Sequence, residues 1–438
     1  MLTYNTTYTG VGYVGGFGTV QNEVEVVFAG GNNLDKDFYM GSLHNASKVT
    51  GTTSVGNVKA TIGEKTGDEI SVKGNVYGAS AVKAGTVTTA STLHTVGDVT
   101  LTLLAGTAAK GAQACVFAGG YATGHDTAKA AAVYTVGSVT ATISNGTWGT
   151  ACGGRGVFGG AMASDNIVDG DEAAGVWAKV GNVDLPISGG TMGNVYGGGW
   201  AQKNAKSEVG DVSITITGGT IANVFGGGST STTGGSTVAD DVTITVSGGT
   251  ITGDIYARGQ TASDSVTGAA NVIFTGGTAF GCGVWGYSYV GETTANTAAL
   301  SFSGYTGTFS GKVGGFTGIT LDGATAMTLA AAADINNAAW TFDLADRSDL
   351  LENTSLLTWT AEAGFSGDRV VVNFADADQA AAGWSIANAN FTGATFDLNI
   401  DSTTVVANIT YDTAISGGDW DGWKFTSVDG TLKFAKLA

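Results

Sequence analysis

Residue types that carry out acid–base or nucleophilic catalysis are sparse in this sequence and lie far apart. The three histidines, His44, His94 and His125, show no pairing pattern, and no nucleophile-elbow motif marks a serine. A polysaccharide lyase would gather basic and acidic side chains on one sheet. The arginines that such a site would use are scattered along the chain at Arg155, Arg258, Arg347 and Arg369. These observations predict that the chain is not an enzyme.

Two groups of carboxylates are candidates for a glycosidase or a metal site. A glycosidase needs two carboxylates roughly 5–10 Å apart. Asp240 and Asp241 stand where other repeats carry Gly-Asp or Gly-Asn, so we interpret them as turn residues that bond the local backbone. The second group lies in the polar segment SDNIVDGDE and consists of Asp165, Asp169, Asp171 and Glu172.

Calcium takes about six to eight oxygen ligands, and the second group has four carboxylates in one segment. Their spacing matches neither an EF-hand nor the repeat of calcium-binding β-rolls. We therefore expect a solvated loop there. Ca²⁺ is the one cofactor for which the chain offers candidate ligands.

The three cysteines are Cys115, Cys152 and Cys282, and none belongs to a CxxC pair, which argues against a zinc site or a redox motif. Their odd number rules out a complete disulfide framework. Cys115 and Cys152 fall in neighbouring repeats and could face each other, so the sequence leaves their pairing open.

The composition indicates a chain that folds, and it excludes several classes of partner. The chain has 72 Gly and a single Pro, Pro186, which excludes collagen. It is 43% hydrophobic and 13% charged, which excludes disorder. Its net charge of −18 argues against binding nucleic acid or an anionic membrane surface. No stretch of about 18 apolar residues occurs, so no transmembrane segment is expected.

A repeated phrase, V-G-(N/D/S)-V, organises much of the chain and begins at Val55, Val96, Val136, Val180 and Val209. Each copy leads into a run that alternates with period two, most clearly at 212–217 and 242–247. Alternation of β-branched residues with Ser or Thr is typical of a half-buried strand. The outer Thr rows leave open a role in binding ice or crystals. A following Gly-Gly-Thr permits a sharp turn.

One aromatic residue recurs once per repeat in a second, short strand. It follows Val or Ile in every copy, and neighbouring copies are 29 to 41 residues apart. Such rings are expected to stack about 4.8 Å apart, and each stacked pair adds about 0.5–1.5 kcal/mol. The predicted aromatic ladder consists of Tyr77, Phe117, Phe158, Tyr196, Phe225, Tyr256 and Trp285.

A polar segment of variable length closes each repeat, as at 121–135, 161–179, 200–208 and 229–238. We interpret these segments as surface loops on one side of the fold, and Tyr134 falls in one of them. Blades of a β-propeller also repeat at about 40 residues, but a repeat of 29 residues hardly holds the four strands of a blade. The sequence therefore predicts an all-β fold, a right-handed parallel β-helix (β-solenoid).

Three regions are expected. Residues 1–50 are a first coil, an N-terminal cap or a strand donated to a neighbour, and residues 51–329 are solenoid repeats. In residues 330–438 glycine thins out and strand-like runs appear at 340–344 and 370–374. These runs predict a β-rich C-terminal domain or cap, because the end of a solenoid must be covered.

The repeats ISGGTMGNVYGGG (187–199) and ITGGTIANVFGGG (216–228) resemble the β-helical passenger regions of autotransporter-type and related bacterial surface proteins. The closing region, from AWTFDL (339–344) to WKFTSVDGTLKFAKLA (423–438), is similar to the non-repetitive end of such passengers. The resemblance implies a β-helical fold and a place on or outside a bacterial cell. It brings no catalytic signature.

These features predict a non-catalytic, extracellular structural or adhesive surface protein, with a glycan or a host or cell surface as its partner. Self-association head to tail into a filament or surface layer is expected, because the two ends of a solenoid are unlike. Residues 1–20 are nearly charge-free and suit strand addition. The alternatives are a monomer whose ends cap their own chain, and a carbohydrate-binding or carbohydrate-active β-helix.

Overall fold

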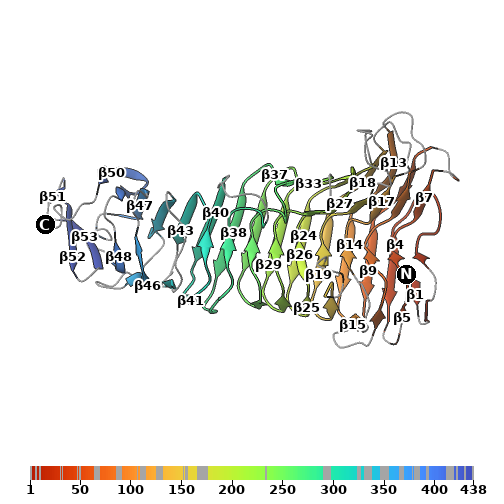
Figure 1. The fold of residues 1–438 in the computed structure, drawn as a ribbon, viewed down its shortest axis with the longest axis horizontal. Coiled ribbons are helices and arrows are strands. Elements are labelled where there is room, and N and C mark those ends of the chain that lie inside the picture. The colour runs from red at the N-terminus through yellow and green to blue at the C-terminus, as the bar shows by residue number, and fades with distance from the viewer. Residues whose placement is uncertain are drawn as a thin grey trace. The chain divides into compact units, whose positions relative to one another are not determined.

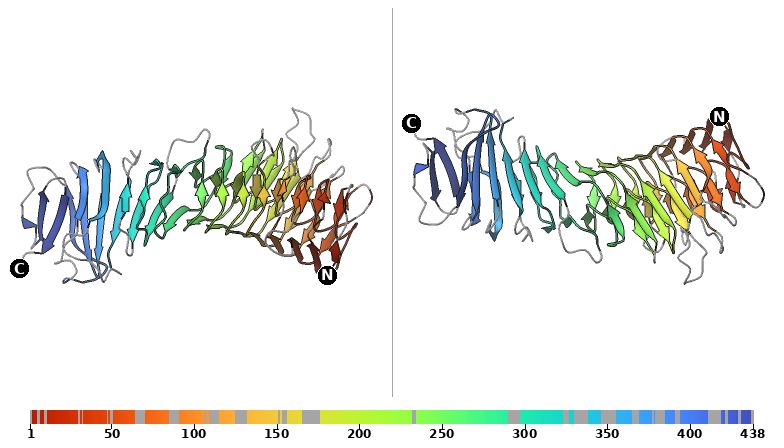
Figure 2. Two further views of the ribbon diagram at one scale, coloured as in Figure 1. Left: turned by 90° about the horizontal axis from the view of Figure 1, so that it is seen from below. Right: turned by 90° about the horizontal axis from the view of Figure 1, so that it is seen from above.

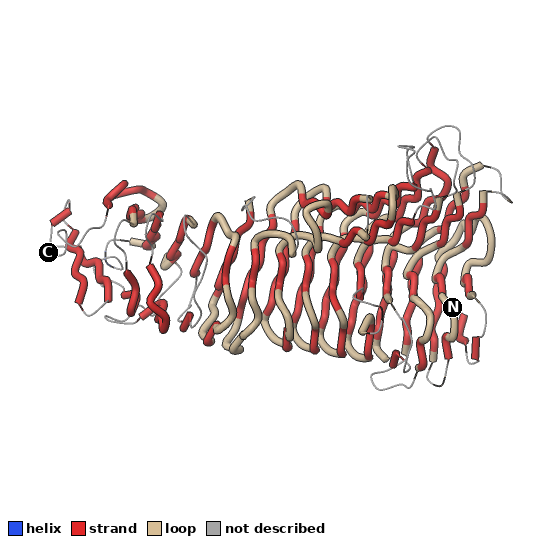
Figure 3. The backbone as a smooth tube through the Cα atoms, viewed as in Figure 1, coloured by secondary structure: helices blue, strands red, loops and turns tan. Residues whose placement is uncertain are grey.

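The structure is a computed structural model in which the named elements are β-strands (Figure 3). It describes Leu2 to Lys436 apart from residues 5–6, 9–10, 30, 32, 47, 49–50, 64–69, 85–90, 106, 109–114, 125–131, 151, 153–155, 165–175, 232–233, 290–296, 323–326, 330–337, 346–354, 365–368, 377, 379–384, 391–393, 411–418, 421–422 and 429–430.

The chain folds into two compact units. The first comprises Met1–Ile244, Gly248–Ala270 and Ser288–Glu292, and the second comprises Thr245–Ser247, Asn271–Tyr287 and Thr293–Ala438. This division does not fall at residue 50 or at residue 330. Strands on both sides of each of those positions pair in the same sheet, as β7 (Leu43–Asn45) does with β12 (Ala81–Lys83) and β44 (Met327–Leu329) does with β46 (Ser355–Gly364).

The longest sheet of the first unit is built from the period-two runs, and we call it the long sheet. Its neighbouring strands pair in parallel and in register, so Val58 pairs with Val99 and Val99 with Val139. Alternate residues are buried, as the pattern predicts. In order, its strands are β1 (Leu2–Tyr4), β4 (Val24–Phe28), β9 (Val58–Ile62), β14 (Val99–Leu103), β19 (Val139–Ile143), β24 (Val183–Ile187), β29 (Val212–Ile216) and β34 (Val242–Val246), which lie side by side in Figures 1 and 2.

A second sheet of the first unit carries the recurring aromatic residues, and we call it the aromatic sheet. Its strands are short and also parallel, with Tyr77 paired to Phe117 and Tyr196 to Phe225. In order, they are β3 (Gly12–Tyr13), β6 (Phe38–Tyr39), β11 (Val76–Tyr77), β16 (Val116–Phe117), β21 (Gly156–Phe158), β26 (Asn194–Tyr196), β31 (Val224–Phe225) and β36 (Ile255–Tyr256).

The interpretation of the polar segments as loops is wrong for the parts that the structure describes, because each segment contains two strands. The first strand of each segment belongs to a third sheet, made of β7, β12, β17 (Tyr121–Thr123), β22 (Met162–Ser164), β27 (Trp200–Gln202) and β32 (Ser229–Thr230). The second strand belongs to a fourth sheet, made of β8 (Thr53–Val55), β13 (Ser91–Val96), β18 (Ala132–Val136), β23 (Val176–Val180), β28 (Lys206–Val209), β33 (Gly235–Val238) and β37 (Asp264–Val266).

The turns after β24, β29 and β34 use the predicted Gly-Gly-Thr. The second glycine of the pair is Gly190, Gly219 or Gly249, and each has a positive φ. Glycine adopts this conformation without steric cost. Short strands follow and form two small parallel sheets. One contains β2 (Thr7–Tyr8), β5 (Asn33–Leu34), β10 (Ser71–Val72) and β15 (Thr107–Ala108); the other contains β20 (Thr147–Trp148), β25 (Thr191–Met192), β30 (Thr220–Ile221) and β35 (Thr250–Ile251).

Some buried side chains of the fourth sheet are serines, and their hydroxyl groups donate hydrogen bonds to the turn between the aromatic and third sheets. Ser207 Oγ donates to the carbonyl of Ala161 over 2.9 Å, and Ser236 Oγ donates to that of Gly199 over 3.0 Å. A Cβ on Gly228 would overlap the Ser236 hydroxyl and the Gly199 carbonyl oxygen. The third glycine of the GGG run is therefore required by this close approach.

We expect Gly228→Ala to lower the free energy of unfolding by about 1–3 kcal/mol, because the added methyl group overpacks a filled interior. Gly235→Ala is the matched control, since the nearest atom to its Cβ would be 3.8 Å away and its φ is not positive. Urea denaturation followed by circular dichroism measures both. Equal losses would show that the turn has room for a side chain.

The second unit also begins with parallel strands and closes with antiparallel ones. One sheet runs β38 (Ala270–Thr275), β40 (Ala298–Ser303), β43 (Gly318–Asp322), β45 (Ala339–Asp343), β47 (Arg369–Phe374), β49 (Thr395–Ile400) and β50 (Thr403–Thr410). A second runs β41 (Thr308–Phe309), β44, β46, β48 (Ser385–Asn390), β53 (Thr431–Lys436), β52 (Trp423–Val428) and β51 (Asp419–Trp420), and a short pair is formed by β39 (Val284–Trp285) and β42 (Val313–Gly314). The pairs that follow β48 and β49 along the chain are antiparallel.

Candidate functional site

The rings of the aromatic sheet stack face to face along the first unit. From Tyr77 to Tyr256, neighbouring ring centroids are 4.3 to 5.3 Å apart and the planes differ by 13° or less. Two rings that the sequence analysis missed extend the stack, with Tyr39 4.4 Å from Tyr77 and Tyr13 4.9 Å from Tyr39. Trp285 lies on β39 in the second unit, where its ring is 5.4 Å from Tyr287.

These rings point away from the long sheet. The glycines that follow Tyr196 and Phe225 face the long sheet instead, since a Cβ on Gly197 would meet Val212 and one on Gly226 would meet Val242. The rings from Tyr39 to Tyr256 are nevertheless buried, because they are covered by their neighbours and by side chains of the third sheet such as Trp200, 6.0 Å from Phe117. Their faces are therefore occupied by one another, and a sugar ring has no free face to stack on within the column.

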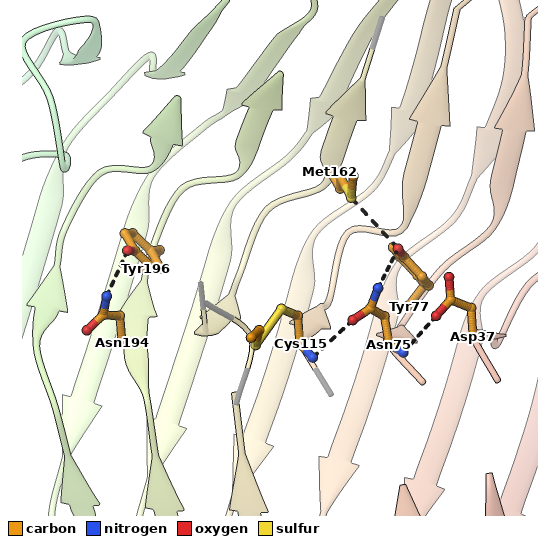
Figure 4. The surroundings of a disulfide bond; sticks show 8 residues. Asp37, Asn75, Tyr77, Cys115, Met162, Asn194 and Tyr196 are labelled. Atoms are coloured by element: carbon orange, nitrogen blue, oxygen red, sulfur yellow. Dashed lines mark hydrogen bonds between the residues drawn. A yellow bond between two sulfur atoms is a disulfide. The ribbon is translucent and has the colours of Figure 1, made fainter. Parts of the chain in front are cut away.

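A polar ladder runs beside the tyrosine rungs (Figure 4). Asp37 accepts the backbone N–H of Asn75 over 2.9 Å, and Asn75 accepts that of Cys115 over 3.1 Å. The amide of Asn75 also donates to the Tyr77 hydroxyl over 3.3 Å. Burial raises the pKa of the Tyr77 phenol, and the charge of Asp37 raises it further, so the hydroxyl stays protonated and structural.

The same pairing recurs at two further tyrosine rungs. The Asn194 amide donates to the Tyr196 hydroxyl over 3.0 Å, and the Tyr256 hydroxyl donates to Asp254 over 3.3 Å. Residues Cys115 and Gly156 hold the equivalent place before phenylalanine rungs, which have no hydroxyl to satisfy. Asn223 holds the same place before Phe225 and donates to Asn194 over 2.9 Å instead, so the residue two positions earlier does not by itself decide between Tyr and Phe.

Cys115 and Cys152 form a disulfide, the pairing that the sequence left open (Figure 4). Both are buried, their Cα atoms are 5.9 Å apart, and 37 residues separate them. Cys282 is buried and does not take part in this disulfide.

We expect Cys115→Ser with Cys152→Ser to lower the free energy of unfolding by about 2–4 kcal/mol, since the crosslink restricts the unfolded chain. Thermal melts of the oxidised protein and of this variant measure the loss. The oxidised protein, once denatured, should show one thiol to a chromogenic reagent, namely Cys282. Three reactive thiols would refute the disulfide.

The V-G-(N/D/S)-V phrase forms the corner between the fourth sheet and the long sheet, and its polar residue links consecutive repeats. Asn57 Oδ1 accepts the backbone N–H of Asp98, and Asp98 Oδ1 accepts that of Ser138, both over 2.9 Å. Asp211 Oδ1 accepts the N–H of Asp241 over 3.1 Å. We call this series the corner ladder.

Asp241 is therefore structural, although not as expected. Its carboxylate accepts the N–H of Ala269 in the next repeat over 2.8 Å, whereas we had expected a bond to the local backbone.

A shallow groove of about 480 Å³ lies along the corner ladder, and both polar and apolar side chains line it. Its carboxylates are those of Asp184, Asp211 and Asp241, and hydroxyl groups from the outer face of the long sheet complete the wall. Asn182 bridges two of these levels by donating to Asp211 over 3.1 Å. The groove offers acceptors and hydroxyls on an open surface, a chemistry suited to hydrogen-bonding a polar ligand.

The outer Thr rows are in register over part of the long sheet. Thr100 pairs with Thr140 and Thr102 with Thr142, but Asp184 and Pro186 interrupt both rows in the next level. A flat, uninterrupted Thr array is therefore not formed on the described strands.

The expectation that the histidines lie far apart is wrong for His44 and His94. His44 and His94 lie 50 positions apart in the chain, yet the Nδ1 atom of each contacts Thr53 Oγ1, over 2.8 Å and 2.6 Å. Thr53 and His94 are register partners on β8 and β13. His125 lies outside the described residues.

The two arginines that the structure describes have separate environments. Arg258 is buried and donates to the carbonyl of Val266 over 2.8 Å. Arg369, in the second unit, pairs through Nε with the buried Asp397 over 2.7 Å. Arg155 and Arg347 lie outside the described residues.

The calcium candidates Asp165, Asp169, Asp171 and Glu172 also lie outside the described residues. Within the described parts of the chain, no three side chains of His, Cys, Asp or Glu gather as a metal site would require. A polar pocket of about 530 Å³ in the second unit is lined by Asp343, Asn373, Asn399 and Asp401, and Asn399 donates to Asn373 over 2.8 Å.

No protein-family model, no curated protein and no solved structure matches the chain. The resemblance to autotransporter passengers therefore stays a prediction from the repeat pattern. Among the described residues, no helix has the length and hydropathy needed to span a bilayer.

Proposed function

We propose that the chain is a right-handed parallel β-helix with a β-rich C-terminal cap, acting outside a bacterial cell as a non-catalytic structural or adhesive protein. The proposal rests on one observation, namely that polar side chains of one repeat hydrogen-bond the backbone of the next repeat. Asn57, Asp98 and Asp211 along the corner, and Asn75 along the rings, bond the next repeat. Such bonds stiffen the first unit along its repeats, a property that a stalk, adhesin or filament subunit needs.

Two further observations support parts of this proposal. A disulfide such as Cys115–Cys152 persists in oxidising surroundings, which favours a place outside the cytoplasm. The antiparallel strands β50 to β53 end the parallel arrangement of the second unit, as a cap would.

The assembly expected from the sequence takes a more definite form with the structure. Residues 2–4 pair with β4 of the same chain, which favours a first coil over a donated strand. β1, β2 and β3 are then the edge strands of three parallel sheets, and an edge strand can accept a strand from another copy. Val11 and Phe17, near these strands in sequence, are exposed by 53% and 66%. We propose that this end contacts the unlike end of a second copy.

Electron microscopy of the full chain at high concentration tests the assembly. We expect filaments that disappear when residues 1–20 are deleted, and also when Val11→Lys and Phe17→Lys are combined. Tyr289→Lys, at a ring of similar exposure elsewhere in the first unit, should leave the filaments intact. A monomer at every concentration would end the assembly proposal and leave a single adhesin or stalk.

The second candidate function is binding of a carbohydrate, favoured by the carboxylates and hydroxyl groups in the groove along the corner ladder. A glycan panel combined with a reducing-sugar assay separates the two functions. Binding that is lost with Asp184→Asn and Ser213→Ala would support this candidate. Robust release of reducing sugar would overturn the non-catalytic proposal.

A further inference from the structure

The two histidines and Thr53 form a buried polar cluster in the N-terminal repeats of the first unit. His44 lies on β7, Thr53 on β8 and His94 on β13, and they are 1%, 4% and 0% exposed. One hydroxyl lies between the two Nδ1 atoms. Neither Nε2 atom has a hydrogen-bond partner among the described residues.

The hydrogen bonds of this cluster determine where its protons are. A hydroxyl has one proton to donate, so Thr53 donates to one imidazole and accepts from the other. One ring then carries its proton on Nδ1 and the other on Nε2. A further proton on the ring that accepts from Thr53 occupies its Nδ1, and Thr53 then loses its acceptor. A further proton on the other ring occupies its Nε2, which has no hydrogen-bond partner among the described residues. In both cases a cation is placed in the protein interior, which is costly without a compensating charge.

No such charge comes from the elements around the cluster. Strands β7, β8, β12, β13 and β18, and residues 14–20, contain no carboxylate in their described stretches. Their titratable groups are the two histidines, Tyr134, whose ring stacks on His94 at 5.9 Å, and Lys83, whose side chain is exposed on β12. The imidazoles therefore face each other and a neutral phenol.

Residues 14–20 are fastened directly beside the cluster. Gly18 donates its N–H to the carbonyl of Leu43, the residue before His44, over 3.1 Å, and Leu43 donates to Gly16 over 2.9 Å. Val20 donates to the carbonyl of Ser54, the residue after Thr53, over 2.8 Å. A shift of β7 against β8 would therefore break the hydrogen bonds that hold this segment.

We propose that His44, Thr53 and His94 form an acid-sensitive latch, which holds residues 14–20 against β7 and β8 at neutral pH and releases them when a proton enters the cluster. The latch is independent of the proposed function, since it regulates the order of the N-terminal end whatever that end contacts.

The direction of the pH effect follows from the pKa values. Burial, and then the neighbouring His44, lower the pKa of His94 from 6.5 to about 4, and burial also lowers the pKa of His44. The opened cluster therefore takes up protons more readily than the closed one. The latch is at full strength above about pH 6.5 and weakens as the pH falls toward 4. The opening equilibrium should increase on the order of 10²-fold over this range.

Hydrogen exchange of the full chain, measured by mass spectrometry at about pH 7 and about pH 4.5 and corrected for intrinsic exchange rates, tests the latch. We expect the amides of Gly18, Val20 and Leu43 to lose protection by roughly 10²-fold in acid. The amides of Thr217 and Thr220, which bond earlier repeats far from the cluster, should keep theirs. Unchanged protection of the first group, or equal loss in both groups, would overturn the proposal without any variant.

Two variants assign the response to the cluster. His94→Phe removes one titrating ring, and Tyr134 at the same register position shows that an aromatic ring fits the column. His44→Asn removes the other ring and keeps a polar atom near the position of Nδ1. Each should flatten the acid response of residues 14–20. His125→Asn is the control; if it also removes the response, or if both cluster variants keep it, the latch is wrong.

Discussion

Phe225→Ala is expected to lower the free energy of unfolding by about 3–5 kcal/mol, because removing a buried ring loses its contacts and leaves a cavity. The Phe225 ring is 2% exposed and lies between Tyr196, at 4.7 Å, and Tyr256, at 5.2 Å. Its loss therefore breaks two stacked pairs as well as removing apolar area from burial. Urea denaturation followed by circular dichroism measures the change.

Tyr289→Ala is the matched control for this experiment. Tyr289 also contacts Tyr256, with centroids 5.2 Å apart, but edge to face and with 57% of the residue exposed. We expect a loss of less than about 1 kcal/mol there, since little area leaves the interior. Similar losses for the two variants would mean that the aromatic column does not contribute as a buried stack.

Tyr134→Ala is expected to destabilise the protein by a similar amount, about 3–5 kcal/mol, although the sequence had suggested a loop residue there. The ring is 0% exposed, stacks on His94, and exchanges two hydrogen bonds with the backbone of Ser80. Burial raises the pKa of its phenol, so the hydroxyl is a donor at any ordinary pH.

Tyr134→Phe separates the hydroxyl from the ring. It leaves the N–H and the carbonyl of Ser80 without this partner, so we expect a loss of about 1–3 kcal/mol. Tyr289→Phe, at an exposed ring, should change stability by less than about 0.5 kcal/mol. If Tyr134→Phe were as harmless as Tyr289→Phe, the Ser80 backbone would have found other partners.

The long sheet and the aromatic column could be predicted because each leaves a regular mark on the sequence. Period two places alternate residues of β29 and β34 in the interior, and one ring per repeat indicates stacking. Tyr39 and Tyr13 were not predicted as members of the ladder, because Phe38 and Gly12 precede them in place of Val or Ile. Stacking depends on the ring itself, so the residue before the ring need not be Val or Ile.

The third and fourth sheets were missed for a different reason. Strands such as β17 and β22 have three residues, too few for alternation to be visible among Thr, Ser and Gly. A signal did exist in the fourth sheet. Thr53, His94 and Tyr134 each stand two residues before the valine that opens a V-G-(N/D/S)-V phrase, so they share a register position. Aligning the repeats on that valine would have brought His94 beside Thr53.

The corner ladder has a consequence for how the length of such a chain can change during evolution. Each Asn or Asp accepts an N–H from the same position of the following repeat, as Asn182 does from Asp211 and Asp211 from Asp241. If residues 212–241 were lost as a block, Asp211 would take the place of Asp241 and would accept the N–H of Ala269, which Asp241 accepts in the present chain. Every donor and acceptor of the corner would still be matched. Duplication or loss of whole repeats is therefore nearly neutral at this corner. Repeats of unequal length also keep the ladder, since its bonded residues lie 41, 40, 29, 30 and 28 positions apart.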